Sequence, residues 1–419
     1  MMSDKKLINL GINKTRAFKI IILFGVISLF GDLIYEGARS VNGPYLVILG
    51  ANAATVGLII GIGELLGYGI RLISGYFSDK TKAYWFFTII GYGLLFTVPL
   101  LSLAGVWQLA AMFIISERIG KALRNPARDT LISQAAKQVG TGFGFALHEF
   151  FDQIGAIIGP FIFMTLFLTI GTSNVKLSDY QQGYSFLWIP FVLLMIFLFI
   201  AYYIGKNTKE LPFIEKEDGK EPSKLSKIFW LYTVFSFITT IGFVNFALIG
   251  YHLKVNNLMF DAQIPLFYAV AMAVDAVIAL LIGKMYDRLK TRRKNEKAGL
   301  MILLIIPILS MLIPAFAFSM NYMFIVMSIV VWGIVMGAHE TIMRAAVADI
   351  TPMKKRGTGY GIFTTTYGVA LFIGSTLVGV LYDYSITFLI TIFVAIEIIA
   401  ILFFFLLWKN ISMENDSYA

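Results

Sequence analysis

The chain has 419 residues, of which 58% are hydrophobic and only 14% are charged. A soluble protein of this length would form about two or three domains, yet many apolar runs here exceed the roughly 18 residues that cross a bilayer. The composition therefore excludes a soluble fold and predicts an all-α polytopic membrane protein. The chain has no cysteine, which excludes disulfide and thiol chemistry, and its three histidines show no metal-ligand spacing. We expect no metal and no cofactor.

Twelve apolar segments can be drawn as membrane spans, in two groups of six. A polar stretch with Pro212, Pro222 and many lysines and glutamates separates the groups. The sequence thus predicts a six-helix bundle over residues 1–205, a cytoplasmic linker over 206–227 and a second six-helix bundle over 228–419. The predicted spans are 17–41, 54–77, 84–103, 107–135, 142–170, 185–204, 228–253, 263–286, 299–318, 322–348, 359–382 and 385–408.

Basic residues gather at alternate loops. They precede the first span, follow the second, eighth, tenth and twelfth, and fill the linker, whereas the opposite side has little beyond Lys176 and Lys254. Lysine and arginine favour cytoplasmic loops, so we expect a multi-pass protein of the cell membrane with both termini in the cytoplasm. The net charge of +9 is then a topology signal, and we expect no nucleic-acid partner. The basic start runs into an ordinary span, which predicts no removable signal peptide.

Charged residues interrupt the apolar pattern most strongly between residues 117 and 160, which we interpret as two spans joined near Lys137. Ionisable groups at membrane depth are costly unless paired or hydrated, so they usually face a cavity or a partner. Folding this hairpin brings Asp152 level with Arg124 and His148 level with Arg128. Two sets of residues share a helical face by their spacing: Glu117, Lys121, Arg124 and Arg128 in the first span, and His148, Asp152, Gly155 and Gly159 in the second.

Proline and glycine in this hairpin predict backbone contacts. Pro126 has no N–H for the carbonyl of Ala122, which predicts a kink or a freed acceptor. Gly155 and Gly159 predict close helix packing, as small residues four apart do in membranes. Tight packing is also expected at the start of the fifth span, at Gly140, Gly142 and Gly144.

The two halves repeat each other. Gly120 is followed by Gly140-Thr141-Gly142-Phe143-Gly144, and 217 residues later Gly337 is followed by Gly357-Thr358-Gly359-Tyr360-Gly361. Gly75-x-x-x-Asp79-Lys80 after the second span is matched by Gly283-x-x-x-Asp287-Arg288 after the eighth. Such parallel repeats indicate two six-span bundles related by an axis normal to the membrane.

These motifs resemble the major facilitator superfamily, and the resemblance covers nearly the whole chain. It implies twelve transmembrane helices in two pseudo-symmetric bundles and transport by alternating access. The glycine–aspartate–lysine/arginine motif is similar to that superfamily's cytoplasmic loop signature, although Lys82 stands where a glycine is usual. Gly155-x-x-x-Gly159-Pro160 is similar to a motif associated with antiporters, although the following glycine pair is absent.

The resemblance also implies site residues, because spans one, four, seven and ten line the central cavity in this superfamily. The candidates for substrate binding are Asp32, Glu36, Lys121, Arg124, Glu340 and Arg344. The candidates for the gate are Gly75, Asp79, Lys80, Arg128, Asp129, Gly283, Asp287 and Arg288. Asp79 and Asp287 are also expected to cap helices, and His339 to be a structural residue.

The leading hypothesis is a secondary transporter of a small, possibly anionic molecule, coupled to protons and working in export. The coupling candidates are Asp32, Glu36, His148 and Asp152. A competing interpretation is that Arg39 and Arg124 hold these carboxylates ionised. A proton-coupled uptake symporter is the second hypothesis, and a membrane sensor or receptor is the third. No nucleophile–base pair or metal-ligand spacing supports an enzyme. The expected partners are the substrate, protons and the lipid bilayer, and the expected state is a monomer.

Overall fold

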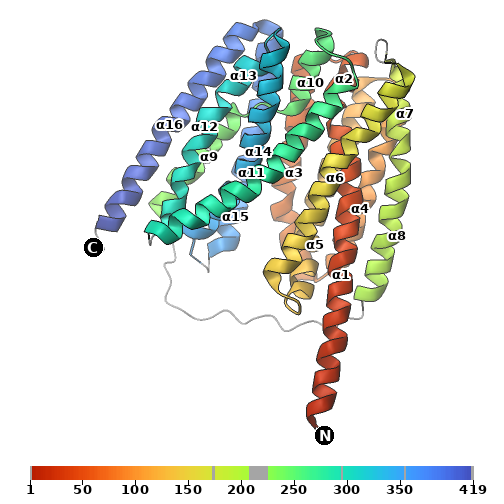
Figure 1. The fold of residues 1–419 in the computed structure, drawn as a ribbon, viewed down its shortest axis with the longest axis vertical. Helices are drawn as coiled ribbons and strands as arrows, with labels where there is room; N and C mark the ends of the chain where they lie inside the picture. Colours follow the sequence, from red (N-terminus) through yellow and green to blue (C-terminus); the bar gives the residue numbers. More distant parts are fainter. Residues whose placement is uncertain (1, 172–174, 207–224, 294–295, 353–354, 417–419) are drawn as a thin grey trace. The chain divides into compact units, whose positions relative to one another are not determined.

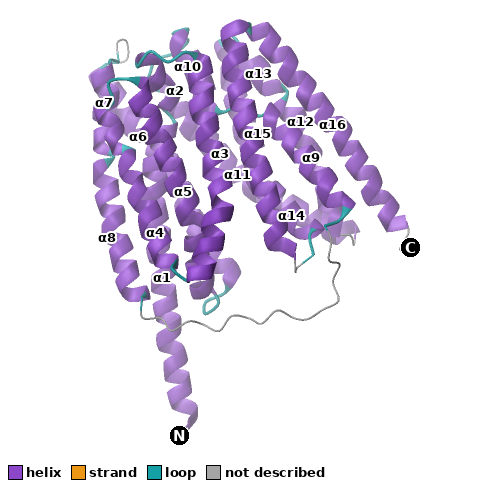
Figure 2. Ribbon diagram, turned by 180° about the vertical axis from the view of Figure 1, so that it is seen from behind, coloured by secondary structure: helices purple, strands orange, loops and turns teal. Residues whose placement is uncertain are grey.

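The computed structural model describes residues 2–171, 175–206, 225–293, 296–352 and 355–416, and every regular element within these ranges is a helix (Figure 1, Figure 2). The predicted all-α class is therefore confirmed. Most of the predicted linker, residues 207–224, lies outside these ranges. The chain divides into two compact units, Met1–Arg39 with Ile70–Glu217 and Ser40–Gly69 with Asp218–Ala419, and each is described by itself.

The first unit contains the helices between the start of the chain and the linker, except for residues 40–69, which belong to the second unit. Its elements are α1 (Met2–Arg39), the end of α3 (Ala53–Thr81), α4 (Tyr84–Gly93), η1 (Leu94–Thr97), η2 (Pro99–Leu103), α5 (Trp107–Ala136), α6 (Thr141–Ile170), α7 (Leu177–Phe186) and α8 (Trp188–Gly205).

The second unit contains the remaining elements. They are α2 (Asn42–Ile48), the start of α3, α9 (Lys227–Gly242), α10 (Phe246–Val255), α11 (Gln263–Arg293), η3 (Glu296–Leu304), α12 (Ile305–Ser310), α13 (Leu312–Ala317), α14 (Tyr322–Ile350), α15 (Arg356–Tyr384) and α16 (Ile386–Asp416).

Eleven segments of the described chain are long and apolar enough to cross a membrane. The predicted fourth span, α5, has 30 residues and also has the length to cross. It stands apart because six of its side chains are charged, all of them between residues 117 and 129.

The predicted seventh span is a broken helix. The seventh span was expected to be continuous, but α9 ends at Gly242 and α10 begins at Phe246. Asn245 caps the new start, because its side chain accepts a hydrogen bond from the amide of Ala247 at 3.0 Å. Hydropathy is continuous across the break in the seventh span, so the apolar pattern did not reveal it. The first span, predicted to end at residue 41, ends at Arg39, and the short helix α2 follows it from Asn42.

In the first unit α1 and α6 lie side by side (Figure 1, Figure 2). A Cβ atom on Gly155 would lie 3.1 Å from the amide nitrogen of Leu33, and one on Gly159 would lie 2.8 Å from that of Gly37. The two backbones approach because these positions lack side chains. The predicted close packing at Gly155 and Gly159 is confirmed.

The α5–α6 turn uses its glycines differently from the prediction. Gly140 has a φ of +109°, in the region that glycine adopts without steric cost. A Cβ atom on Gly144 would lie 2.7 Å from that of Ala136, whereas one on Gly142 would meet nothing within 4 Å. Tight packing is thus confirmed at Gly144 and wrong at Gly142, and Gly140 makes the turn.

Pro126 frees a backbone acceptor, as predicted. The hydroxyl of Ser74 on α3 donates to the carbonyl of Ala122 on α5 at 2.7 Å, and this contact is buried. The side chain of one helix therefore replaces the N–H that proline removes from the other. A Cβ atom on Gly75 would lie 3.5 Å from that of Pro126, so the two helices also touch at the next residue.

The second unit is built around α9, α11, α14 and α16. Trp332 of α14 is fully buried, and its indole N–H donates to the carbonyl of Val244 at 2.9 Å. That carbonyl lies in the break between α9 and α10, so a core side chain satisfies backbone that the helix leaves open. Gly337 of α14 allows close packing, since a Cβ atom there would lie 2.8 Å from the carbonyl oxygen of Asp275 on α11.

Candidate functional site

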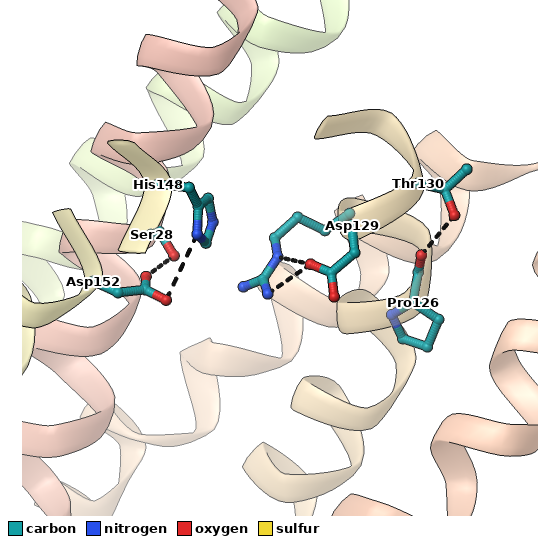
Figure 3. Close-up of polar contacts among 7 residues, drawn as sticks. Ser28, Pro126, Asp129, Thr130, His148 and Asp152 are labelled. Atoms are coloured by element: carbon teal, nitrogen blue, oxygen red, sulfur yellow. Dashed lines mark hydrogen bonds and ion pairs between the residues drawn. The ribbon is translucent and has the colours of Figure 1, made fainter. Parts of the chain in front are cut away.

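Asp152 on α6 is held from two helices (Figure 3). The hydroxyl of Ser28 on α1 donates to one carboxylate oxygen. Nδ1 of His148 lies 3.7 Å from the other, one helical turn away on α6. His148 is 4% exposed, and its Nε2 has no hydrogen-bond partner in the described part of the chain. A buried imidazole and a carboxylate thus meet at the α1–α6 contact.

Asp32 and Glu36 follow Ser28 along α1 but have different partners. Oε2 of Glu36 lies 3.6 Å from a guanidinium nitrogen of Arg39, and both side chains are nearly buried. Asp32 interacts electrostatically with Asp152 and with Lys121 of α5. Glu36 is therefore an ion-pair partner of Arg39. Asp32 and Asp152 interact electrostatically with each other and with Lys121.

Three cations surround Tyr35 of α1, which is 4% exposed. Nζ of Lys121 lies 3.7 Å from the ring centroid, and the guanidinium carbons of Arg118 and Arg39 lie 4.7 Å and 5.8 Å from it. An aromatic face attracts cations. Arg118 also lies 3.7 Å from a carboxylate oxygen of Glu117. The arrangement gathers three cations and the carboxylates that interact with them, Glu36, Glu117 and Asp32, between α1 and α5.

Arg124 is engaged by α4. Its side chain is 2% exposed, donates to the carbonyl of Gly91 at 3.4 Å and lies 4.9 Å from the ring centroid of Tyr92. The predicted level of Asp152 with Arg124 stays a prediction. Arg128, one turn further along α5, interacts electrostatically with Asp152. The same arginine acts on His148, which agrees with the other predicted pairing.

Arg128 pairs with its sequence neighbour (Figure 3). Its Nε and one terminal nitrogen donate to the same oxygen of Asp129 at 2.9 Å and 2.8 Å. Adjacent positions of a helix point in different directions, and the long arginine side chain bridges them. One turn away, the hydroxyl of Thr130 donates to the carbonyl of Pro126 at 2.9 Å.

His148, Glu149 and Asp152 also form the kind of cluster that binds metal ions. Each offers a ligand atom, and these atoms all lie within 4.8 Å of one another. Their spacing on α6 was missed in the sequence, where histidine and aspartate were interpreted only as proton-handling groups. Arg128 acts on both His148 and Asp152, and a neighbouring cation disfavours a divalent metal. The geometry suits proton handling better than metal binding.

The predicted gate residues of the first half lie at the end of α3 and on α5. Asp79 accepts a hydrogen bond from the hydroxyl of Tyr84 at 3.1 Å, and Nζ of Lys80 lies 5.6 Å from the ring centroid of Tyr76. Asp79 does not cap α4, whose N-cap is Ala83 and makes no side-chain bond. It ties the end of α3 to the start of α4 through a tyrosine instead.

Lys82 occupies the position where the family resemblance expects glycine. Its φ is +55°, in the left-handed region that side chains other than asparagine and aspartate disfavour. Lys82 therefore adopts a backbone conformation that glycine adopts readily, although its own side chain disfavours it.

The matching residues of the second half lie near the end of α11. A Cβ atom on Gly283 would lie 3.3 Å from the methyl of Thr341 on α14, and Asp287 and Arg288 are exposed. The main link from α11 to α14 was missed. Asp349 accepts hydrogen bonds from the hydroxyl of Tyr286 at 2.8 Å and from Nζ of Lys290 at 2.7 Å. The only sequence feature that pointed to this contact was a carboxylate, Asp349, near the end of a predicted span.

The other predicted residues of the second unit lie on α14. Nδ1 of His339 lies 3.1 Å from the hydroxyl of Tyr367, and its ring lies 5.0 Å from that of Phe243. Glu340 is partly buried, and the side chain of Arg344 lies outside the described part of the structure. His339 therefore packs in an aromatic cluster, as its predicted structural role requires.

Comparison with known proteins identifies the family. The model of the Major Facilitator Superfamily matches residues 22–339 and 295–414. The chain belongs to the major facilitator superfamily. An uncharacterised protein of Mycobacterium tuberculosis is 38% identical over 395 residues, 93% of each chain. An uncharacterised MFS-type transporter of Methanocaldococcus jannaschii is 26% identical over 385 residues, 89% of this chain and 91% of the relative.

Solved structures agree on the fold. A bacterial homologue of the human lysosomal transporter Spinster has a TM-score of 0.69 at 14% identity, and the match covers 93% of this chain and 96% of the other. Membership of the superfamily makes the chain a multi-pass membrane transport protein. It also confirms the resemblance on which the predicted site residues rest, but it does not assign roles to those residues.

Proposed function

We propose that this major facilitator superfamily protein is a proton-coupled exporter of a small anionic molecule, working by alternating access. The observation that carries the proposal is the contact between Asp152, Ser28 and His148, with Asp32 and Lys121 within electrostatic reach. Ionisable groups inside a membrane bundle usually mark a substrate or proton path. A carboxylate beside a histidine, with a lysine nearby to offset its charge, can take up and release a proton.

The substrate class follows from the charge around Tyr35. Lys121, Arg118 and Arg39 converge on that ring, whereas Arg124 is occupied by α4. An anion or carboxylate that met Lys121 would pair with its ammonium group. Lys121 is therefore the leading substrate contact of the first unit, and Glu340 and Arg344 remain the candidates of the second.

Export is preferred to uptake because Gly155, Gly159 and Pro160 follow most of the pattern associated with antiporters, and the two glycines make the predicted α1–α6 contact. The second candidate, proton-coupled uptake, uses the same groups with the opposite direction of proton flow. We place the protein in the plasma membrane. The distribution of its basic loops puts both termini in the cytoplasm.

The coupling test uses purified protein in vesicles. A panel of small carboxylates is loaded, a pH gradient is imposed, and each compound is followed by mass spectrometry. Asp32→Asn and Asp152→Asn should abolish pH-driven accumulation while keeping exchange at equal concentrations. Asp179→Asn is the matched control, because Asp179 accepts hydrogen bonds at the start of its own helix, from the amide of Lys176 at 2.7 Å and the hydroxyl of Ser178 at 3.4 Å. Wild-type pH dependence in both variants would refute the coupling assignment.

The substrate test compares Lys121→Gln with Lys137→Gln, an exposed lysine in the α5–α6 turn. Loss of affinity for carboxylates is expected only in the first. Equal affinities in the two variants would contradict the proposed anion contact, whatever the result of the coupling test.

Topology can be read directly, because the chain has no cysteine and any introduced thiol is unique. Lys137→Cys should react with an impermeant maleimide only from the cytoplasmic side, and Ser178→Cys only from the outside. The reverse pattern would overturn the proposed orientation.

A further inference from the structure

Glu397 is a buried carboxylate that the proposed mechanism does not use. It is the sole charged residue between positions 386 and 408, within the apolar span formed by α16. Its side chain is 0% exposed. An ionisable residue inside a membrane span is expensive to keep and is therefore a candidate for function.

The carboxylate contacts the end of α9. The hydroxyl of Thr239 lies 2.8 Å from Oε2, while Oε1 has no hydrogen-bond partner among the residues that the structure describes. Oε1 lies directly against Gly242, where any Cβ atom would collide with it. The lack of a side chain at Gly242 thus lets the carboxyl group reach the backbone of α9.

Gly242 is the last residue of α9. The final carbonyls of a helix lack intrahelical donors and carry partial negative charge. An ionised carboxylate at this end is repelled, whereas a protonated carboxyl group can donate a hydrogen bond to a carbonyl or to the hydroxyl of Thr239. The break in the seventh span therefore creates a place that favours the neutral acid.

No described cation offsets a negative charge at Glu397. The elements packed against α16 are α9, α12, α13, α15 and η3, and the only described side chain on them that acts on Glu397 is that of Thr239. A buried carboxylate without a cation or several donors is strongly disfavoured. The described charged residues of these elements all lie at helix ends: Lys227, Lys297, Arg356 and Asp383.

We propose that Glu397 and the broken end of α9 form a proton-binding site of the second unit, separate from the Asp32–Asp152 group. In this packing Glu397 carries the proton. Releasing it requires water or a cation to reach the α9–α16 contact, so proton release is linked to separation of these helices. The site rests on this geometry and does not depend on the direction or substrate of transport.

Infrared spectroscopy of the full-length protein in lipid tests the site, with protons and deuterons as the only ligands. The wild-type minus Glu397→Gln difference spectrum should contain the carbonyl stretch of a protonated carboxylic acid, shifted by deuteration. Thr239→Val should move this band by removing its hydrogen-bond partner, and Thr239→Ser should leave it in place. The Asp179→Asn control should leave the Glu397 band in place.

A difference spectrum with only ionised-carboxylate bands from Glu397 would overturn the proposal. The isosteric Glu397→Gln should fold normally, as checked by gel filtration. If it does not, dicyclohexylcarbodiimide labelling of wild type provides the second readout, because this apolar reagent modifies protonated carboxyl groups. Modification of Glu397 found by peptide mass spectrometry supports the site, and an unmodified Glu397 refutes it. Neither readout needs a transported compound, so failure here is distinct from failure of the proposed export.

Discussion

Ser74→Ala would test whether one hydroxyl replaces the hydrogen bond that Pro126 removes from α5. Ser74 is 2% exposed, and its hydroxyl donates to the carbonyl of Ala122 at 2.7 Å. The variant leaves this buried acceptor without its donor, a loss of about 1–3 kcal/mol. We expect the free energy of unfolding to fall by that amount, as measured by denaturant titration in micelles with tryptophan fluorescence.

Ser78→Ala is the matched control. Ser78 is also 2% exposed and also on α3, and its hydroxyl donates to the carbonyl of Gly75 at 3.0 Å, much as Ser74 also reaches that of Arg71 at 3.3 Å within the same helix. The Gly75 carbonyl lies in the helix and has a backbone partner as well. The control should therefore lose about 1 kcal/mol or less, and equal losses in the two variants would contradict the proposed role of Ser74.

Pro126→Ala completes a double-mutant cycle. Alanine restores an N–H that can reach the carbonyl of Ala122, so Ser74→Ala should be milder in this background, with a coupling energy on the order of 1 kcal/mol. An unchanged effect of Ser74→Ala would show that the Ala122 carbonyl does not depend on it, and would refute the reasoning.

Three further predictions concern helix contacts and the loop after α3. Gly91→Ala should destabilise by about 1–3 kcal/mol, because its Cβ atom would lie 2.6 Å from the carbonyl oxygen of Gly120; Gly93→Ala, with open space around it, should be neutral or stabilising in the same titration. Lys82→Gly should stabilise by up to about 1 kcal/mol, and a lower thermal midpoint would argue against strain at φ +55°. Asp349→Asn should weaken its link to α11 by roughly 1 kcal/mol, visible as faster hydrogen exchange there.

Several features of this protein were determined by the sequence alone. Composition established the membrane class, because no soluble domain can cover so much apolar surface. Helical spacing placed His148 and Asp152 on one face and marked Gly155 and Gly159 for close packing. Pro126 predicted a freed carbonyl at Ala122, because proline has no backbone N–H to donate. Each of these inferences needed only information within a few positions of the chain.

The tertiary structure decided which groups meet. Ser74, the donor to Ala122, lies 48 positions away, and no local pattern points to it. Asp152 meets Ser28 of α1, where the glycine contacts bring α1 and α6 together. The sequence pattern did not reveal the break in the seventh span either. Trp332 and Asn245 provide the hydrogen bonds that the open backbone needs there. Hydropathy indicates which residues avoid water. The partners of buried polar groups depend on which helices pack together, and only the tertiary structure determines that.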